Sequence, residues 1–391
     1  MRYILIIGDG IADRPVHALA GKTPLESLEL PALSKLAGGL LGRARTVPKG
    51  AEPGSDTAIL SIFGYDPRAN YTGRAALEAA GAGVALAPGE LAWRVNLCAV
   101  HGERFRDAVM RSHNGGGIDG RDALDTVAAL RASPAFASLA KALRFTLHES
   151  ASFRQMATAP GGTDWGAALP GPHDHLGERV DTLLPPGGIR LLVEASFEAL
   201  RGRQANCIWP WCPGEAMRLE GFSARYGHSG PVISAVPLVK GIAALCGLAA
   251  PVVDGATGTL NTNYAGKVKA ALAGLRAGAD FAAIHVEAPD ECAHALDLAG
   301  KLEAIRRIDS RIVRPLLRAL EADGEPFRVL FLSDHPTHVE TGAHDGAAVP
   351  FCVYDSRNAA APRAFSERAA ATGVCVEDGT LLMRMLFDTA F

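Results

Sequence analysis

The sequence predicts an α/β fold built on a doubly wound, mostly parallel β-sheet. Three short runs of apolar residues, 3–7, 281–286 and 329–332, are each followed by a loop that carries an acidic residue. Stretches with apolar residues at helical spacing, such as 265–277 and 302–320, lie among them. Continuous apolar runs are typical of parallel strands that are covered on both faces. Their alternation with helices favours a doubly wound sheet.

Length and composition narrow the class of protein. The chain has 391 residues, which favours either one large core or a core with an inserted domain. Hydrophobic residues make up 48% and charged residues 21%, as in ordinary globular proteins. A net charge of −3 offers no basic surface for nucleic acid. We find no run long enough to span a membrane and no signal peptide, and we expect a cytoplasmic protein.

The middle of the chain differs from the rest and predicts an inserted cap. Residues 102–181 are rich in polar residues, glycine and histidine around one helix near 121–130. Helix-like and strand-like stretches resume after them, up to the strand expected at 205–211. We therefore expect a core formed by 1–101 and 182–391, with a smaller α+β cap domain between its two parts.

Carboxylates and imidazoles gather after the predicted strands. Asp290 and His294 are four residues apart, so a helix beginning there would place both on one face. Alone, this pair could equally be a solvated helix start with a capping acid. Asp334 and His335 are adjacent at a strand end, and His344 follows nine residues later. Such mixed ligands suit Mn²⁺ or Zn²⁺, whereas Mg²⁺ prefers oxygen ligands, and two ions are plausible.

A serine provides the second chemical signal. Ser55 stands in the segment PGSDT, directly before the helix-compatible AILSIFG. A serine at a helix N-terminus can face an anion, and a neighbouring divalent cation would make its hydroxyl a nucleophile. The alternative role for Ser55 is a simple helix cap. Asp9 follows the first strand, where ligands bind in α/β sheets. GDGIAD lacks the third glycine of a dinucleotide-binding motif.

Eight segments resemble a known family. They are, in chain order, GDGIADRP, GKTPLESLELPALSKLA, PGSDTAILSIFGYDP, YTGRAALEAAGAGVAL, VKGIAALCG, VDGATGTLNTNYAGK, HVEAPDECAH and SDHPTHVETGAH. Together they strongly resemble the archaeal-type, cofactor-independent phosphoglycerate mutases of the alkaline phosphatase superfamily. The resemblance implies an alkaline phosphatase-like core with Ser55 as its nucleophile. It also implies two metal sites, one formed by Asp9, Ser55, Asp334 and His335, the other by Asp290, His294 and His344.

The sequence resembles one branch of this family more closely. CIWPWCPG and GPHDHLG are similar to segments of a bacterial branch that has been proposed to phosphorylate homoserine. In addition, RSHNGGGID stands where archaeal mutases have a DRRAGR-like stretch. We expect substrate-binding side chains in these and neighbouring segments: Arg74, Arg94, Asn96, Arg154, His173, Asp174, His175 and Lys240. His285 and His338 are expected to be structural.

The function implied by the resemblance is the interconversion of 3-phosphoglycerate and 2-phosphoglycerate through a phosphoserine, without 2,3-bisphosphoglycerate. The alternatives are a related phosphotransferase or a phosphomonoesterase on another small phosphorylated metabolite, including a homoserine kinase-like activity. No phosphate-binding GxxxxGK[ST] motif is present, because Gly21-Lys22-Thr23 lacks the first glycine. A degenerate relative that binds without catalysing a reaction would lack one of the metal-ligating residues, and none of the seven is missing. The sequence is compatible with a monomer or a homo-oligomer.

Overall fold

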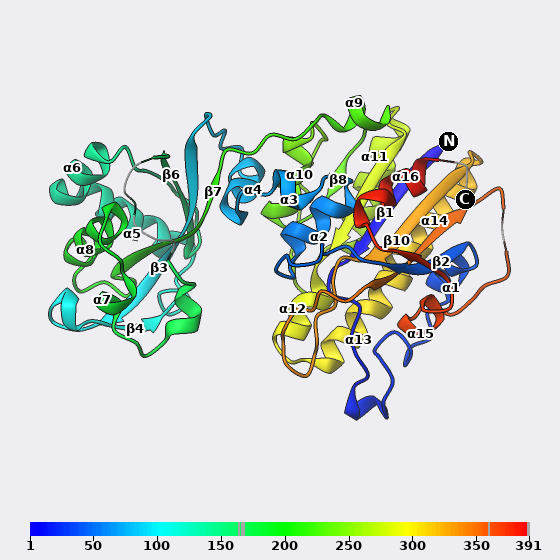
Figure 1. The fold of residues 1–391 in the computed structure, drawn as a ribbon, viewed down its shortest axis with the longest axis horizontal. Helices are drawn as coiled ribbons and strands as arrows, with labels where there is room; N and C mark the ends of the chain where they lie inside the picture. The colour runs from blue at the N-terminus through cyan, green and yellow to red at the C-terminus, as the bar shows by residue number, and fades with distance from the viewer. Residues whose placement is uncertain (163–164, 166–168, 359, 389–391) are drawn as a thin grey trace. The chain divides into compact units, whose positions relative to one another are not determined.

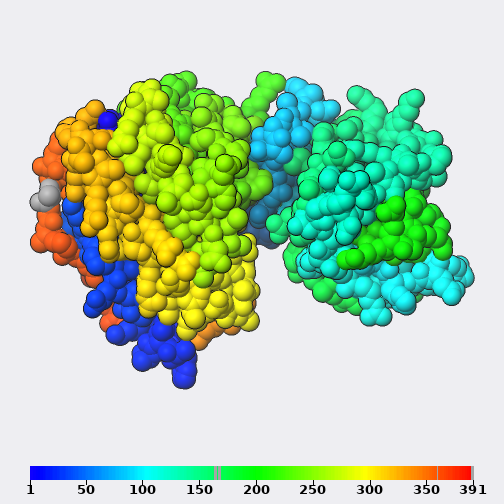
Figure 2. Space-filling view, turned by 180° about the vertical axis from the view of Figure 1, so that it is seen from behind, coloured from blue at the N-terminus to red at the C-terminus, as the bar shows by residue number. Residues whose placement is uncertain are grey.

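The chain forms two compact units. The computed structural model describes residues 1–162, 165, 169–358 and 360–388. The first unit consists of Met1–Tyr71 and Arg218–Phe391, and the second of Thr72–Met217. Both ends of the chain thus contribute to the first unit, where dark-blue and yellow-to-red atoms share one body (Figure 2).

A seven-stranded sheet forms the centre of the first unit (Figure 1). The three predicted strands lie side by side at its middle in the order β10-β1-β9, all parallel. Nearly every residue of these strands is buried, so both faces of the sheet are covered. The α/β fold class with a mostly parallel sheet is thereby confirmed. The strands in spatial order are β12 (Val374–Val376), β2 (Leu40–Ala44), β11 (Val349–Asp355), β10 (Phe327–Ser333), β1 (Arg2–Gly8), β9 (Phe281–Val286) and β8 (Val232–Ile233).

Helices connect and cover these strands. The helix predicted at 265–277 is α11 (Tyr264–Arg276), which Asn263 caps by accepting a hydrogen bond from the Gly266 N–H. The predicted helix at 302–320 is real, but a π-helical segment, η4 (Ile308–Val313), interrupts it just before Pro315. Proline cannot donate a backbone hydrogen bond, and the wider turn precedes it. The other helices are α1 (Pro31–Ala37), α2 (Ser55–Ile62), α3 (Pro67–Asn70), α9 (Phe222–Tyr226), α10 (Pro237–Leu245), α12 (Ala288–His294), α13 (Leu298–Arg307), α14 (Arg314–Asp323), α15 (Glu367–Ala370) and α16 (Leu382–Phe387), together with the 3₁₀ turns η1 (His17–Leu19) and η5 (Gly379–Leu381). None of the helices in the described part of the chain is long and apolar enough to cross a membrane.

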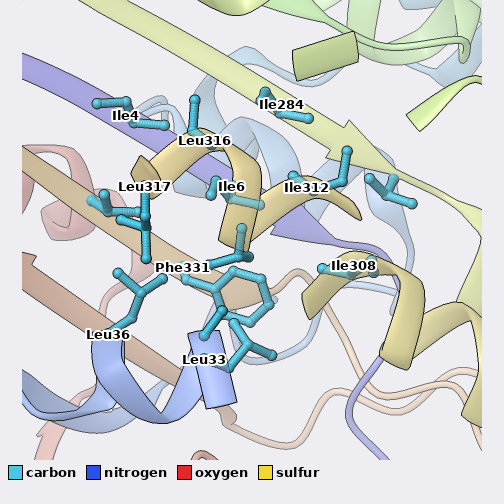
Figure 3. Close-up of a cluster of buried hydrophobic side chains, with 14 of the residues drawn as sticks. Ile4, Ile6, Leu33, Leu36, Ile284, Ile308, Ile312, Leu316, Leu317 and Phe331 are labelled. Atoms are coloured by element: carbon cyan, nitrogen blue, oxygen red, sulfur yellow. The ribbon is translucent and has the colours of Figure 1, made fainter. Parts of the chain in front are cut away.

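The main core lies between the sheet and the helices on one of its faces. Side chains of β1, β9 and β10 meet those of α1, η4 and α14 there (Figure 3). Phe331, at the middle of β10, is fully buried and packs edge-on against Phe365. The labelled members of this cluster are Ile4, Ile6, Leu33, Leu36, Ile284, Ile308, Ile312, Leu316, Leu317 and Phe331.

The second unit is a smaller α+β insertion with a core of its own. Its long central strand β3 (Glu90–His101) pairs antiparallel with β4 (Val109–Ser112), β6 (Arg154–Pro160) and β7 (Cys207–Glu215), and β5 (Thr146–His148) pairs with β6. Its helices and turns are α4 (Arg74–Gly81), η2 (Phe105–Asp107), α5 (Gly120–Ala132), α6 (Pro134–Ala142), η3 (Pro172–His175), α7 (Val180–Leu183) and α8 (Gly188–Ala199).

The insertion is longer than the predicted 102–181. The prediction placed β3 and β7 in the core, but Leu91–Cys98 of β3 pairs with Cys207–Glu215 of β7 inside the second unit. Such pairing between residues more than a hundred positions apart leaves no local pattern in the sequence. The boundaries of the compact unit are therefore Thr72 and Met217. Its role as a cap over the site stays a prediction.

We expect Phe331→Ala to lower the free energy of unfolding of the first unit by about 3–5 kcal/mol, because a buried ring is replaced by a cavity. Urea denaturation followed by far-UV circular dichroism measures this change. All four tryptophans lie in the second unit, so the tryptophan fluorescence midpoint should stay unchanged. Val252→Ala, at a position that is 81% exposed, is the control. A loss below 1 kcal/mol would contradict the assigned packing.

Candidate metal and nucleophile site

Three carboxylates meet at the carboxyl edge of the central strands. Asp9 directly follows β1, Asp334 directly follows β10, and Asp290 lies in the first turn of α12, shortly after β9. Because these strands are parallel neighbours, their carboxyl ends lie at the same edge of the sheet. The three side chains are at most 8% exposed, so water screens their charges weakly.

Ser55 lies beside two of these groups. Its Oγ is 3.0 Å from Nε2 of His335 and 3.3 Å from Oδ2 of Asp9. Gly54, not Ser55, occupies the capping position of α2, and Ser55 is the first residue of the helix itself. The alternative that Ser55 is only a helix cap is therefore wrong. Its hydroxyl instead faces the acidic group.

Asp290, His294 and His344 form a second group. As the four-residue spacing predicted, α12 places Asp290 and His294 on one face, with 3.2 Å between Oδ2 and Nε2. Nε2 of His344 lies 3.4 Å from Oδ1 of Asp290 and 2.9 Å from Nε2 of His294. The ring of His344 also packs on the ring of His335, with 4.1 Å between centroids.

The hydrogen-bond partners of these rings indicate where their lone pairs point. Nδ1 of His294 is 2.8 Å from the carbonyl oxygen of Gly342, and Nδ1 of His344 is 3.2 Å from that of Pro53. A carbonyl only accepts, so each Nδ1 carries a hydrogen and each neutral ring leaves Nε2 bare. Two bare nitrogens facing one carboxylate are a donor set for a cation. A proton can take the place of that cation. When Nε2 of His294 is protonated, its hydrogen bond to Asp290 stabilises the charged ring and raises the pKa of His294.

Thr337 joins the two groups and was missed by the sequence analysis. Its hydroxyl donates to Oδ1 of Asp290 at 2.5 Å and accepts from Nδ1 of His335 at 3.2 Å. This arrangement leaves Nε2 of His335 bare as well, facing Ser55 and Asp334. Gly10 makes room for this contact, because at its φ of +61° a Cβ would lie 2.6 Å from the Thr337 hydroxyl.

The side chains and backbone groups around Asp334 and Asp9 do not supply enough positive charge to balance these carboxylates. Oδ1 of Asp334 accepts from the backbone N–H groups of Gly10 and His335, but its buried Oδ2 has no hydrogen-bond partner among the described residues. Burial, followed by the charges of Asp334, Asp290 and Glu287, raises the pKa of Asp9 well above its usual value. An unpartnered oxygen amid like charges fits a site that takes up cations.

Two groups of ligand atoms lie close enough to hold a metal ion. They are Asp9, Asp334 and His335 in one group and Asp290, His335 and His344 in the other, with the atoms of each group within 4.8 Å of one another. His294 adjoins the second group, and Ser55 the first. The structure thus brings all seven predicted ligands together. The residues present suit two divalent cations.

A buried ion pair supports the loop that carries His335 and His344. Nζ of Lys301 donates to Oδ2 of Asp13 at 2.7 Å and to the carbonyl oxygen of Thr337 at 2.6 Å. The ring of His338 lies between Asp13 and Asp345, 3.1 Å from each, as expected for a structural histidine. His285 is also buried, but its ring contacts Asp9.

The second unit holds most of the predicted substrate-binding residues. Glu78, on α4, is 2.9 Å from Arg74 and 3.1 Å from Arg94, and the Arg94 guanidinium lies over the ring of Trp211 at 4.4 Å. Although burial opposes ionisation, Arg94, Arg74 and Arg154 lower the pKa of Glu78. One carboxylate among three guanidinium groups leaves an excess of positive charge. We call Arg74, Arg94, Arg154 and Glu78 the arginine group.

The remaining predicted residues separate into two sets. Asn96 accepts a hydrogen bond from the Trp211 indole at 2.9 Å, and the His173 ring packs on the same indole, so both adjoin the arginine group. Asp174 lies beside His173, while His175 lies 3.1 Å from Glu178. Lys240 is on α10 of the first unit, whereas the arginine group belongs to the second.

The fold and these side chains define an α/β protein with a candidate divalent-metal site beside a serine. The sequence model of the 2,3-bisphosphoglycerate-independent phosphoglycerate mutase family matches residues 37–201. A Geobacter sulfurreducens protein named as a probable mutase of this kind is 39% identical, over 99% of this chain and all of that one. One from Methanosarcina acetivorans is 40% identical over 90% of each chain. The solved structure of a Pyrococcus horikoshii protein superposes with a TM-score of 0.78, at 27% identity, over 100% of this chain and 99% of the other.

Similarity of this degree over nearly the whole length shows the family. The chain belongs to the 2,3-bisphosphoglycerate-independent phosphoglycerate mutases, a family of isomerases.

Asp334→Asn should change stability in opposite directions with and without metal. The amide keeps the oxygen that accepts from Gly10 and His335, and it places an N–H donor where Oδ2 now has no partner. In EDTA we expect the variant to be more stable than the parent by about 1–3 kcal/mol, because a buried unpaired charge is removed. With saturating Mn²⁺ the parent should be the more stable protein. Thermal melting in both buffers measures this.

Glu340→Gln, at an exposed position of the same loop, is the matched control and should leave both melting temperatures unchanged. A variant that is destabilised equally in both buffers would contradict the assignment of Asp334 to a cation site.

Proposed function

We propose that the protein interconverts 3-phosphoglycerate and 2-phosphoglycerate through a phosphoserine at Ser55. The observation that carries the proposal is the position of the Ser55 hydroxyl, 3.0 Å from His335 and 3.3 Å from Asp9 at the edge of a buried acidic group. Membership of the mutase family supports it.

Two divalent cations complete this proposed site. Asp9, Ser55, Asp334 and His335 would hold one ion, and Asp290, His294 and His344 the other. Bound divalent cations stabilise a serine alkoxide and the negative charge of a phosphoryl group. Mixed carboxylate and imidazole ligands suit Mn²⁺ first, then Zn²⁺, with Mg²⁺ third.

The proposed reaction has two in-line displacements at phosphorus. In the first, the Ser55 hydroxyl loses its proton, its Oγ bonds to the phosphorus of 3-phosphoglycerate, the bond to the C3 oxygen breaks, and that oxygen takes up a proton in turn. In the second, the C2 hydroxyl of the bound glycerate loses its proton and attacks the phosphoserine, and Ser55 leaves as its hydroxyl. The phosphoryl group and the proton are both returned, so the reaction consumes no water.

The glycerate must stay bound between the two displacements. We propose that the arginine group of the second unit takes part in substrate binding, because three guanidinium groups near one carboxylate leave positive charge for an anion. Arginine binds carboxylates through paired N–H donors, which fixes the orientation of the ligand. Exclusion of water is needed at the same stage, since water would turn the phosphoserine into free phosphate.

The second candidate is a phosphotransferase or phosphomonoesterase on another small phosphorylated metabolite. CIWPWCPG favours it because this segment resembles one of the branch proposed to phosphorylate homoserine. RSHNGGGID favours it because it replaces the DRRAGR-like stretch of archaeal mutases. In the structure, CIWPWCPG forms most of β7 and supplies Trp211 to the arginine group. The specificity of this protein would then depend on its second unit, while Ser55 would act in the same way.

Phosphorus NMR distinguishes these functions. With Mn²⁺ and 3-phosphoglycerate we expect the signal of 2-phosphoglycerate to grow without free phosphate. Release of free phosphate alone would indicate a phosphomonoesterase. Formation of phosphohomoserine from ATP and homoserine, without isomerisation, would contradict the mutase proposal in favour of the second candidate.

Ser55→Ala should lower kcat by about 1,000-fold or more, because the substitution removes the proposed acceptor of the phosphoryl group. Ser61→Ala is the matched control, since Ser61 is a buried serine of the same helix whose hydroxyl has no partner in the described structure. Incubation with labelled substrate, followed by mass spectrometry, should find phosphate on Ser55 of the parent. Substantial turnover by Ser55→Ala would remove the nucleophile assignment.

Arg94→Lys should lower kcat/KM by about 10- to 100-fold although the charge is kept. A lysine cannot both reach Glu78 and stack on Trp211 as the planar guanidinium does. Steady-state kinetics measures the change, and Arg121→Lys, at an exposed position of the same unit, is the control. Unchanged kinetics would exclude the arginine group from substrate binding.

A further inference from the structure

His285 connects the sheet to the candidate metal site. It lies near the end of β9, opposite Ile7 of β1, and its side chain is 1% exposed. Nε2 of its ring is 2.9 Å from Oδ2 of Asp9, and Nδ1 is 3.1 Å from Oγ of Ser234. The ring is therefore enclosed between a proposed metal ligand and a buried serine. It is too deeply buried to contact a substrate.

The direction of the hydrogen bonds around the His285 ring follows from the carboxylate. An ionised Asp9 only accepts, so Nε2 of His285 carries the ring hydrogen and donates it to Oδ2, which leaves Nδ1 as an acceptor. Ser234 can donate to that Nδ1, because its oxygen accepts from the backbone N–H of Val236 at 3.0 Å and its own hydrogen is left over.

The backbone of His285 is fixed as well as its ring. Nζ of Lys267, a fully buried lysine of α11, donates to the carbonyl oxygen of His285 at 2.8 Å. Parallel pairing with β1 holds the strand on its other side. The place of the ring and its orientation are thus supported by Ser234, Lys267 and strand β1, which do not belong to the site.

The consequence for Asp9 is that its two oxygens differ. Oδ2 accepts the hydrogen of His285, while Oδ1 has no such donor among the described residues and lies 3.7 Å from Nε2 of His335; Oγ of Ser55 is near both, at 3.3 Å from Oδ2 and 3.5 Å from Oδ1. A neutral donor satisfies one oxygen without adding positive charge that would repel a cation. A lysine or arginine in the same place would neutralise the carboxylate and compete with the metal.

We propose that His285 is a positioning residue, which holds Oδ2 of Asp9 so that Oδ1 is presented to the metal ion beside Ser55. This inference rests on the proposed metal site and deepens it. Hydrogen-bonded partners of metal ligands typically change affinity by about 10- to 100-fold. His285 would act in this way through its donor, not through its volume.

The test compares two substitutions at the same position. His285→Phe keeps a planar ring but removes the donor, whereas His285→Gln keeps an amide N–H that can reach Asp9. Titration calorimetry with Mn²⁺ on metal-free protein should show that Phe weakens one of two sites by about 10- to 100-fold and that Gln restores most of the affinity. The Mn²⁺ EPR spectrum should change for Phe alone.

His228→Phe is the matched control, because His228 also bonds an aspartate, Asp280, in the same unit but outside the site. Ser234→Ala provides a second variant if His285→Phe fails to fold, and we expect it to weaken the same site by less. Equal Mn²⁺ affinity of the parent, His285→Phe and Ser234→Ala would overturn the proposal, as would a parent that binds no Mn²⁺.

The outcome is separable from the proposed reaction. If the parent binds two Mn²⁺ ions and His285→Phe weakens one of them, the positioning role holds even when NMR shows no isomerisation. In that case the proposed function fails alone. If isomerisation is seen and His285→Phe binds Mn²⁺ like the parent, only the positioning role fails.

Discussion

Repulsion among three buried carboxylates is the constraint on which the rest of the site depends. Parallel pairing of β9, β1 and β10 brings Asp290, Asp9 and Asp334 to one edge of the sheet. Burial, followed by the charges of Asp334 and Asp290, raises the pKa of Asp9 well above its usual value. The fold stabilises the strands through the core beneath them, and this stability holds the acids together. Repulsion within the acidic group therefore lowers the stability of the metal-free protein, and bound cations would remove this repulsion.

The neighbours of these carboxylates are neutral donors. Oδ1 of Asp334 accepts from two backbone N–H groups, Asp290 accepts from the Thr337 hydroxyl, and Asp9 contacts the His285 ring. The two buried lysines nearby are engaged elsewhere, Lys301 by Asp13 and Lys267 by a backbone carbonyl. Neutral donors orient a carboxylate and leave its charge unneutralised. The negative charge of the carboxylates is thus left to be balanced by cations that bind to the protein.

The sequence predicted what depends on local pattern. Apolar runs ending in acids gave the three central strands, and a four-residue spacing placed Asp290 and His294 on one helix face. The contact of Thr337 with Asp290 and the extent of the second unit depend on residues 47 and more than 100 positions apart. Contacts between residues so far apart leave no periodic pattern in the sequence. His285 shows the same limit, because a histidine inside an apolar strand has the pattern of a core residue whether or not its ring touches Asp9.

The division of the chain separates the two kinds of chemistry. All seven proposed ligands belong to the first unit, whereas the arginine group lies entirely in the second. Each group is held by its own sheet and its own core, so a change in one need not disturb the packing of the other. The proposed chemistry at Ser55 and the proposed binding at the arginine group therefore depend on separate packing. The segment CIWPWCPG forms most of β7 in the second unit.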